Sequence, residues 1–193
     1  VLFRSVEEAV ETLIARYPHL KIIPIITTCS TEAIGDDIEG IIRKVNPKIK
    51  ENHPDRDVKL IAVHTPSYSG SQVTGYDTAI SAIVKALAKK DEPSGKLNIF
   101  TGWVNPGDVS EIKHILSEMQ VDGNILLDTE TFDAPVMPDK SAFAYGNTTI
   151  EEIADSANAL GSIALSRYEG ANAAKYLKDK FGVPSIVTPT PIG

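Results

Sequence analysis

Short apolar runs rich in β-branched residues alternate along this chain with segments whose apolar residues recur every three or four positions. The clearest runs, 22–26, 59–64 and 97–101, are each followed by a polar turn and then by a segment with helical spacing. Strands that alternate with helices in this way form parallel sheets with helices on both faces. We therefore predict an α/β fold, in which ligands bind beyond the carboxyl ends of the strands.

The remaining elements follow from the same patterns. Further strands are expected at 124–128, 162–166 and 185–188. Helices are expected at 6–17, in one piece from about 34 to 45, at 73–87 and 112–119, from 148 or 149 onward, and at 171–180. Asp108 with Glu111 resembles a capping box. The polar stretches 46–57 and 129–147 contain prolines and are predicted to be loops. The segment 90–96 is the best linker candidate, so we predict two domains, 6–92 and 96–193.

Cys29 is the only cysteine of the chain, and it stands where a predicted strand ends and a predicted helix begins. Backbone N–H groups and the helix dipole at such a turn favour a thiolate, which is the form that binds iron–sulfur clusters. A small buried apolar side chain is the alternative interpretation. One cysteine cannot complete a metal site, so any further ligands must come from sequence outside this chain or from another chain.

Composition excludes several classes of function. The net charge of −7 argues against a nucleic-acid surface, and no apolar run reaches the roughly 18 residues of a membrane span. The chain has no P-loop, no G-x-G-x-x-G and no G-x-S-x-G motif, so no catalytic residue is assigned. We expect a cytoplasmic protein without a membrane or nucleic-acid partner. Both ends of the sequence lack natural start or stop features, so a fragment is expected.

Several long motifs, in order, resemble the β subunit of nitrogenase component 1. They are TTCSTEAIGDD at 27–37, HTPSYSGSQVTGYD at 64–77, TGWVNPGD at 101–108, GNTTIEE at 146–152, ADSANA at 154–159 and RYEG at 167–170. The resemblance runs from about Val6 to Gly193 and implies Rossmann-like domains. The motifs GWVNPGD and SRYEG are more similar to the vanadium-dependent and iron-only enzymes than to the molybdenum enzyme, and we favour vanadium.

The resemblance implies roles for three residues. Cys29 would be a thiolate ligand of the P-cluster, the [8Fe-7S] centre shared between the α and β subunits. Ser67 would be the serine whose oxygen binds a cluster iron when the cluster is oxidised. Ile34 matches a surface position where the ATP-hydrolysing iron protein docks. The cluster would relay electrons from that protein to the cofactor of the α subunit, which reduces dinitrogen to ammonia.

The chain departs from the family pattern in ways that keep alternatives open. The cluster cysteines that precede the Cys29 segment in the family are absent here, as is the C-terminal domain, so this piece alone should be inactive. A cofactor assembly scaffold is the second hypothesis, which the intact Thr65-Pro66-Ser67 disfavours. A chlorophyllide-type reductase is disfavoured by the match after Gly95, and the simplest alternative is an α/β domain with a buried cysteine.

Overall fold

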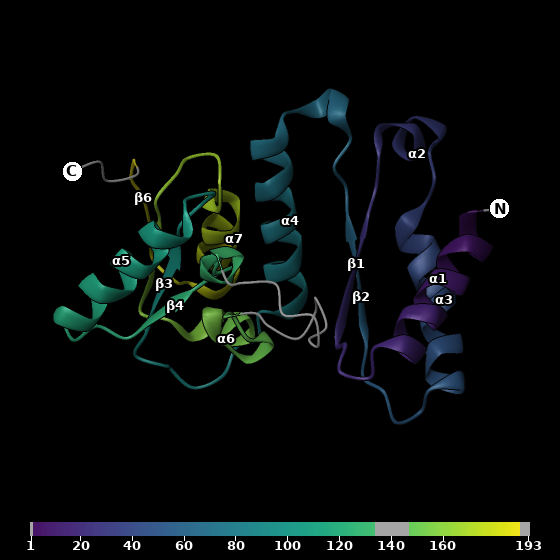
Figure 1. The fold of residues 1–193 in the computed structure, drawn as a ribbon, viewed down its shortest axis with the longest axis horizontal. Coiled ribbons are helices and arrows are strands. Elements are labelled where there is room, and N and C mark those ends of the chain that lie inside the picture. Colours follow the sequence, from purple (N-terminus) through teal and green to yellow (C-terminus); the bar gives the residue numbers. More distant parts are fainter. Residues whose placement is uncertain (1, 134–146, 190–193) are drawn as a thin grey trace. The chain divides into compact units, whose positions relative to one another are not determined.

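The computed structural model describes residues 2–133 and 147–189, which form two compact units, Val1–Ser71 and Gln72–Gly193. The division lies before helix α4 (Gln72–Leu87), whereas the sequence places a domain boundary at 92–96. Helix α4 belongs to the second unit because it packs against α7 (Ala171–Phe181). The described elements are parallel strands and helices, so the predicted α/β class is confirmed (Figure 1).

The first unit is a two-stranded parallel sheet with helices packed on it. Its elements are α1 (Leu2–Arg16), β1 (Ile22–Ile26), α2 (Cys29–Ile34), α3 (Ile38–Asn52), β2 (Lys59–Val63) and the 3-10 turn η1 (Ser67–Ser69). Strands β1 and β2 pair in register from Ile22 with Lys59 to Ile26 with Val63. Helices α1 and α3 bury one apolar stripe each against the sheet, and this core contains Val10, Ile14, Ile23, Val45, Ile49 and Leu60.

The single helix expected after Cys29 is wrong, because the chain forms two helices there. Gly35 ends α2 with a φ of 79°, a left-handed conformation that glycine adopts without steric cost. Asp37 then starts α3 by accepting a hydrogen bond from the Gly40 N–H, with N and Oδ1 2.7 Å apart. A Cβ at Gly40 would require that carboxylate to shift and would disturb its hydrogen bond to the Gly40 N–H.

The loop expected at 46–57 is also largely wrong, because α3 continues to Asn52 with Pro47 inside it. A proline inside a helix removes one backbone hydrogen bond and costs about 3 kcal/mol. Val45 and Ile49 flank it and are buried in the core of the first unit, whereas Pro47 faces solvent. Burial of these two side chains offsets the cost of the proline, since each contributes about 1.5–3 kcal/mol.

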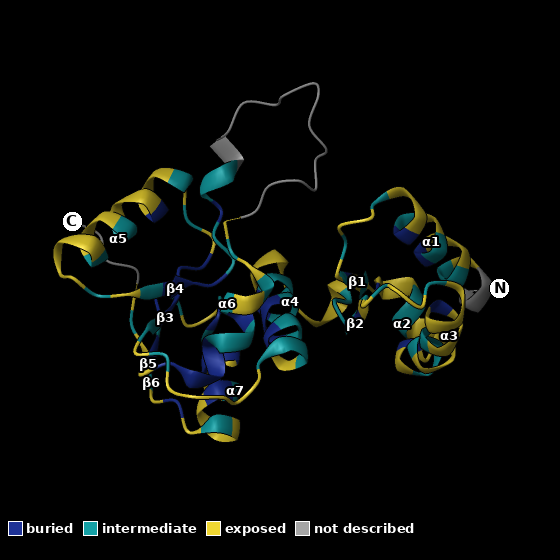
Figure 2. Ribbon diagram, turned by 90° about the horizontal axis from the view of Figure 1, so that it is seen from below, coloured by how far each residue is buried: buried dark blue, intermediate teal, exposed yellow. Residues whose placement is uncertain are grey.

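The second unit is a parallel sheet in the order β4-β3-β5-β6. Its strands are β3 (Leu97–Phe100), β4 (Gly123–Ile125), β5 (Gly161–Ala164) and β6 (Ser185–Val187). Its helices are α4, α5 (Pro106–Glu118), α6 (Ile150–Asp155) and α7, with the 3-10 turns η2 (Glu130–Asp133) and η3 (Ser156–Asn158). Phe100 points to the core formed with α4, α6 and α7, and the neighbouring Ile99 points to the core formed with α5. This sheet therefore has helices on both faces (Figure 2).

Two local expectations change in this unit. Asn105, rather than Asp108, caps α5, and the Asp108 carboxylate accepts a hydrogen bond from the Asn105 N–H in a reciprocal capping box. The helix therefore begins at Pro106, whose fixed φ suits a first helical position. Strand β4 ends at Ile125, and most of the predicted loop 129–147 lies outside the described residues.

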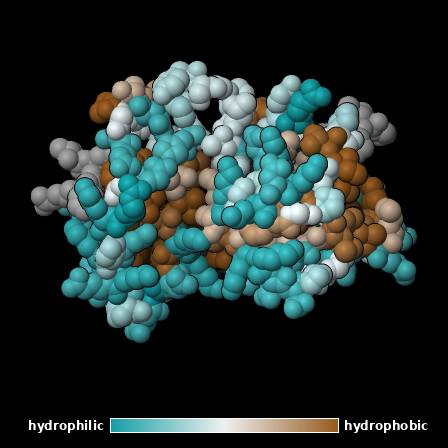
Figure 3. Space-filling model, turned by 180° about the vertical axis from the view of Figure 1, so that it is seen from behind, coloured by the Kyte–Doolittle hydropathy of each residue, from teal (hydrophilic) through white to brown (hydrophobic). Residues whose placement is uncertain are grey.

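The surface of the second unit is apolar near β6. Ile186 and Val187 on this edge strand are exposed, and Figure 3 shows hydrophobic atoms on the right of the view, where β6 lies. Among the described helices, none is both long enough and apolar enough to cross a membrane.

Candidate functional site

Cys29 and Ser67 both follow the carboxyl ends of the two strands of the first unit. Because Ile26 and Val63 are register partners, the segments that leave β1 and β2 start side by side. Cys29 is the first residue of α2 and Ser67 is the first residue of η1. Both side chains are exposed, and neither has a hydrogen-bond partner among the described residues. The alternative of a buried apolar cysteine is therefore wrong for this chain.

Thr27 and Thr65 tie these two segments together. The Thr27 N–H donates to the Val63 carbonyl at 3.0 Å, which extends the strand pairing by one residue. The Thr65 N–H donates to Thr27 Oγ1 at 3.2 Å, and the Thr65 hydroxyl donates to the Thr27 carbonyl at 3.0 Å. Thr27 is buried, so these bonds are shielded from water. The backbone that leads to Cys29 and to Ser67 is thus held as one piece.

His64 links the same two segments through its side chain. The imidazole Nδ1 lies 2.5 Å from Glu32 Oε1 on α2, and Nε2 lies 2.8 Å from Glu39 Oε1 on α3. Glu32 Oε1 also accepts the Thr27 hydroxyl at 2.5 Å. Since a carboxylate only accepts, both ring nitrogens donate, which is the pattern of a protonated imidazolium.

The hydrogen bonds of this cluster shift the pKa values of His64, Glu32 and Glu39 so that each charged form is favoured. Hydrogen bonds to Glu39 and Glu32 raise the pKa of His64 and outweigh the lowering effect of its burial. The Thr27 hydroxyl and then His64 lower the pKa of Glu32. The hydrogen bond from His64 likewise lowers the pKa of Glu39. Sequence reasoning missed both glutamates, because they lie 32 and 25 residues from His64 and no local pattern joins them.

Ile34 is the last residue of α2, and 77% of its surface is exposed. The left-handed Gly35 turns the chain away directly after it. A single exposed apolar side chain is common on protein surfaces, so its exposure alone assigns Ile34 no partner.

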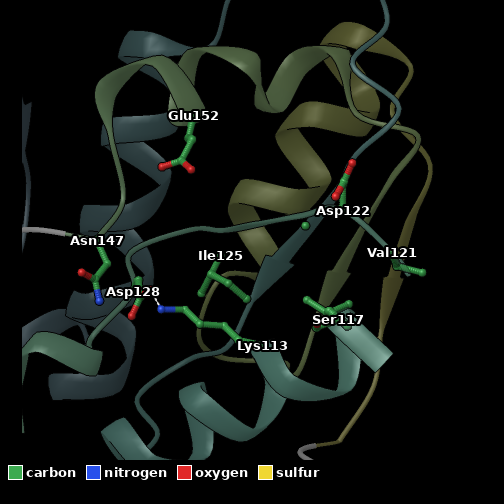
Figure 4. Close-up of a pocket in the computed structure, with 10 residues that line it drawn as sticks. Lys113, Ser117, Val121, Asp122, Ile125, Asp128, Asn147 and Glu152 are labelled. Atoms are coloured by element: carbon green, nitrogen blue, oxygen red, sulfur yellow. Dashed lines mark ion pairs between the residues drawn. The ribbon is translucent and has the colours of Figure 1, made fainter. Parts of the chain in front are cut away.

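A separate pocket lies along β4 in the second unit and has a volume of about 360 Å³. It contains none of the residues predicted as ligands. Lys113 Nζ lies 2.6 Å from Asp128 Oδ2 (Figure 4) and also pairs with Glu130. Burial lowers the pKa of Lys113, but hydrogen bonds to the two carboxylates outweigh that effect and raise it. This ion-pair network joins α5 to the residues after β4.

The described residues do not form a complete metal site by themselves. In the described residues 2–133 and 147–189, no group of three or more His, Cys, Asp or Glu side chains is arranged to hold a metal ion. Cys29 offers one sulfur and Ser67 one oxygen, both facing solvent. A cluster bound here would need ligands from another source.

Comparison with known proteins identifies the family. The family model for nitrogenase component 1 type oxidoreductases matches residues 3–193. The chain belongs to this family. A solved structure described as "Nitrogenase Cp1 at pH 6.5" matches it with a TM-score of 0.90 and 30% sequence identity, over 99% of this chain and 41% of that chain. The family-based expectation of Rossmann-like component 1 domains is therefore confirmed.

Curated members of the family are similar over nearly the whole chain. The nitrogenase vanadium-iron protein beta chain of Trichormus variabilis is 70% identical over 97% of this chain, and the nitrogenase iron-iron protein beta chain of Rhodobacter capsulatus is 55% identical over 97%. A nitrogenase molybdenum-iron protein beta chain of Methanococcus maripaludis is 42% identical over 89%. The chain spans 41% of the length of the first two relatives. Component 1 proteins of this family carry metal clusters.

Proposed function

We propose that this chain is part of the β subunit of a nitrogenase and supplies ligands to its P-cluster, the [8Fe-7S] centre shared with the α subunit. The observation that carries the proposal is the placement of Cys29 and Ser67. Each lies a few residues beyond the carboxyl end of β1 or β2, and those two strand ends are neighbours in the sheet. Their exposure supports a site that is completed by a second subunit. The β-chain names of the similar proteins support the same interpretation.

Each ligand contributes a different chemistry. Cys29 would bind iron through its thiolate in every oxidation state, since thiolates are the usual ligands of iron–sulfur clusters. Ser67 would bind through Oγ as an alkoxide, with its proton passing to solvent. An alkoxide is a harder ligand than sulfide, so it suits iron that has become more positive. When bound, the cluster supplies an electron relay between the reductase and the cofactor of the α subunit.

Ile34 is proposed to contact the ATP-hydrolysing iron protein that delivers the electrons. Its exposed position at the other end of the six-residue helix α2 from Cys29 supports this role, because a docked donor would then lie close to the ligand segment. The electrons would pass on to the α subunit for reduction of dinitrogen to ammonia. A partner that hydrolyses ATP makes the cytoplasm the proposed location.

The vanadium type is the form that we propose. Its support is the higher identity to a vanadium-iron beta chain, 70%, than to an iron-iron chain, 55%, or a molybdenum-iron chain, 42%. The assembly scaffold is not proposed, because these relatives are named as nitrogenase β chains and Ser67 is present.

The test uses the complete β subunit with its α partner and records the P-cluster EPR spectrum after oxidation. Cys29→Ala and Ser67→Ala should each remove or alter the signal. Two matched controls change only a neighbouring hydroxyl. Ser30→Ala alters a residue beside Cys29, and Ser69→Ala alters the same turn η1, where Ser69 donates to the Pro66 carbonyl at 3.0 Å.

The expected result is a changed signal in the two ligand variants and an unchanged signal in both controls. A normal P-cluster signal in Cys29→Ala and Ser67→Ala would show that these are ordinary turn residues and would overturn the ligand assignment. A [4Fe-4S] signal in the unmodified complex would instead favour the assembly scaffold.

A further inference from the structure

The bridge formed by Glu32, His64 and Glu39 connects three elements around the proposed ligands. Glu32 lies three residues after Cys29 in α2, and His64 lies three residues before Ser67 at the end of β2. Glu39 holds the second ring nitrogen from α3. The side chain of His64 therefore fastens the serine segment to the cysteine helix and to the helix that follows it.

We propose that Glu32, His64 and Glu39 are positioning residues that hold the Ser67 segment against the Cys29 segment, so that Ser67 Oγ reaches the oxidised cluster without a rearrangement of the backbone. This inference rests on the proposed function and deepens it. None of the three is proposed to touch the cluster, and their effect is exerted through Ser67.

Because the bridge is partly exposed, we expect it to affect the position of Ser67 more than the stability of the fold. The side chains of His64 and Glu39 are 40% and 53% exposed, and that of Glu32 is 22% exposed. Ion pairs with this much solvent contact contribute little to the free energy of unfolding. The two hydrogen bonds nevertheless fix the orientation of the His64 ring, because the ring cannot turn without breaking one of them. Thr65 is a further anchor of the turn that carries Ser67, through its hydrogen bonds to Thr27, the residue that follows β1.

The chain offers a matched control within the same unit. His53, at the end of α3, pairs with Glu11 of α1, with Nε2 and Oε2 2.6 Å apart. The side chains of this second histidine–carboxylate pair are also partly exposed, at 25% and 27%. His53 follows the C-terminal end of α3, whereas Glu39 lies in the first turn of that helix. The variant His53→Gln therefore removes a histidine–carboxylate pair without touching either ligand segment.

The experiment measures the midpoint potential of the P-cluster step that involves Ser67, by EPR-monitored redox titration of the complete α and β complex. His64→Gln leaves a neutral side chain that cannot hold both carboxylates as an imidazolium does. We expect Ser67 to bind the oxidised iron about tenfold more weakly, which corresponds to a positive shift of about 59 mV for a one-electron step. Glu39→Gln, a change at an exposed position, should give a smaller shift in the same direction, and His53→Gln should give none.

A double-variant cycle isolates the action through Ser67. In the Ser67→Ala background, His64→Gln should cause no further shift of the potential, because the ligand that it positions is gone. An equal shift in both backgrounds, or equal shifts for His64→Gln and His53→Gln, would overturn the inference while leaving the proposed function intact. If the unmodified complex gives no P-cluster signal, the proposed function fails and the inference fails with it.

Discussion

Glu32 and His64 lie 32 residues apart in the chain, yet Oε1 of the first is 2.5 Å from Nδ1 of the second. The contact joins helix α2 to the end of β2, and the parallel pairing of β1 and β2 makes it possible. Together with the hydrogen bonds between Thr65 and Thr27, it joins the segment of Cys29 to the segment of Ser67.

The histidine bridge should give the free energy of unfolding a small dependence on pH, because its side chains are partly exposed. The raised pKa of His64 means that its contribution is complete below about pH 6.5, the ordinary value, and is lost as the pH rises through the raised pKa. The lowered pKa values of Glu32 and Glu39 mean that their contribution is complete above about pH 4.5 and is lost at more acid pH. The bridge therefore stabilises the fold most between these two values.

This pH dependence is measured by urea unfolding of the 193-residue chain and of His64→Gln, followed by circular dichroism. The difference in unfolding free energy should be larger at about pH 5.5 than at about pH 9. A difference that stays the same at both pH values would show that His64 is not an imidazolium in the folded chain.

Asp77 should be a strong determinant of stability in the second unit. It is buried in α4, accepts the Gly170 N–H at 2.7 Å and also accepts the side-chain amide of Asn172. Asp77→Ala would leave a buried donor without a partner, which should lower the free energy of unfolding by about 3 kcal/mol. The measurement is urea unfolding, and the control is Thr78→Ala, whose exposed hydroxyl donates to the Thr74 carbonyl within the same helix. The control should change stability by less than about 0.5 kcal/mol.

Gly170 should not tolerate a side chain. Its φ is 96°, and an added Cβ would lie 2.5 Å from the Cβ of the buried Phe100. Gly170→Ala should lower the free energy of unfolding by about 3 kcal/mol, because backbone strain adds to overpacking. Gly95 has a φ of 73° with no atom within 4 Å of an added Cβ. Gly95→Ala should therefore show the strain alone, about 1 kcal/mol. Equal losses in the two variants, measured by thermal or urea unfolding, would remove the role of the Phe100 contact.

Ile34 should matter for electron delivery and not for folding. Its side chain is 77% exposed, so Ile34→Asp should change the unfolding free energy by no more than about 0.5 kcal/mol. In the complete complex, the same change should slow electron transfer from the iron protein by roughly tenfold, since a charge replaces an apolar docking contact. The measurement is stopped-flow oxidation of the reduced iron protein. Leu160→Asp, at a residue of the second unit that is 63% exposed, is the matched control and should leave the rate unchanged.

Local sequence patterns predicted much of the fold. Strand β1 covers the predicted residues 22–26, and β2 and β3 each end one residue before the predicted limit. These segments are β-branched and apolar, and polar turns bound them, so short-range preferences suffice. The same patterns placed Cys29 and Ser67 after strand ends, whereas their proposed roles came from family resemblance alone.

Tertiary structure decided what local patterns could not. Helix α3 runs through Pro47 because Val45 and Ile49 are buried against α1 and the sheet, and that burial overrides a local helix breaker. The bridge of His64 to its two glutamates exists only because parallel pairing and two helices bring distant residues together. The sequence by itself determined the alternation of strands and helices through backbone and hydrophobic preferences. Long-range packing determined the helix limits and the charge network, because those depend on neighbours that are remote in the chain.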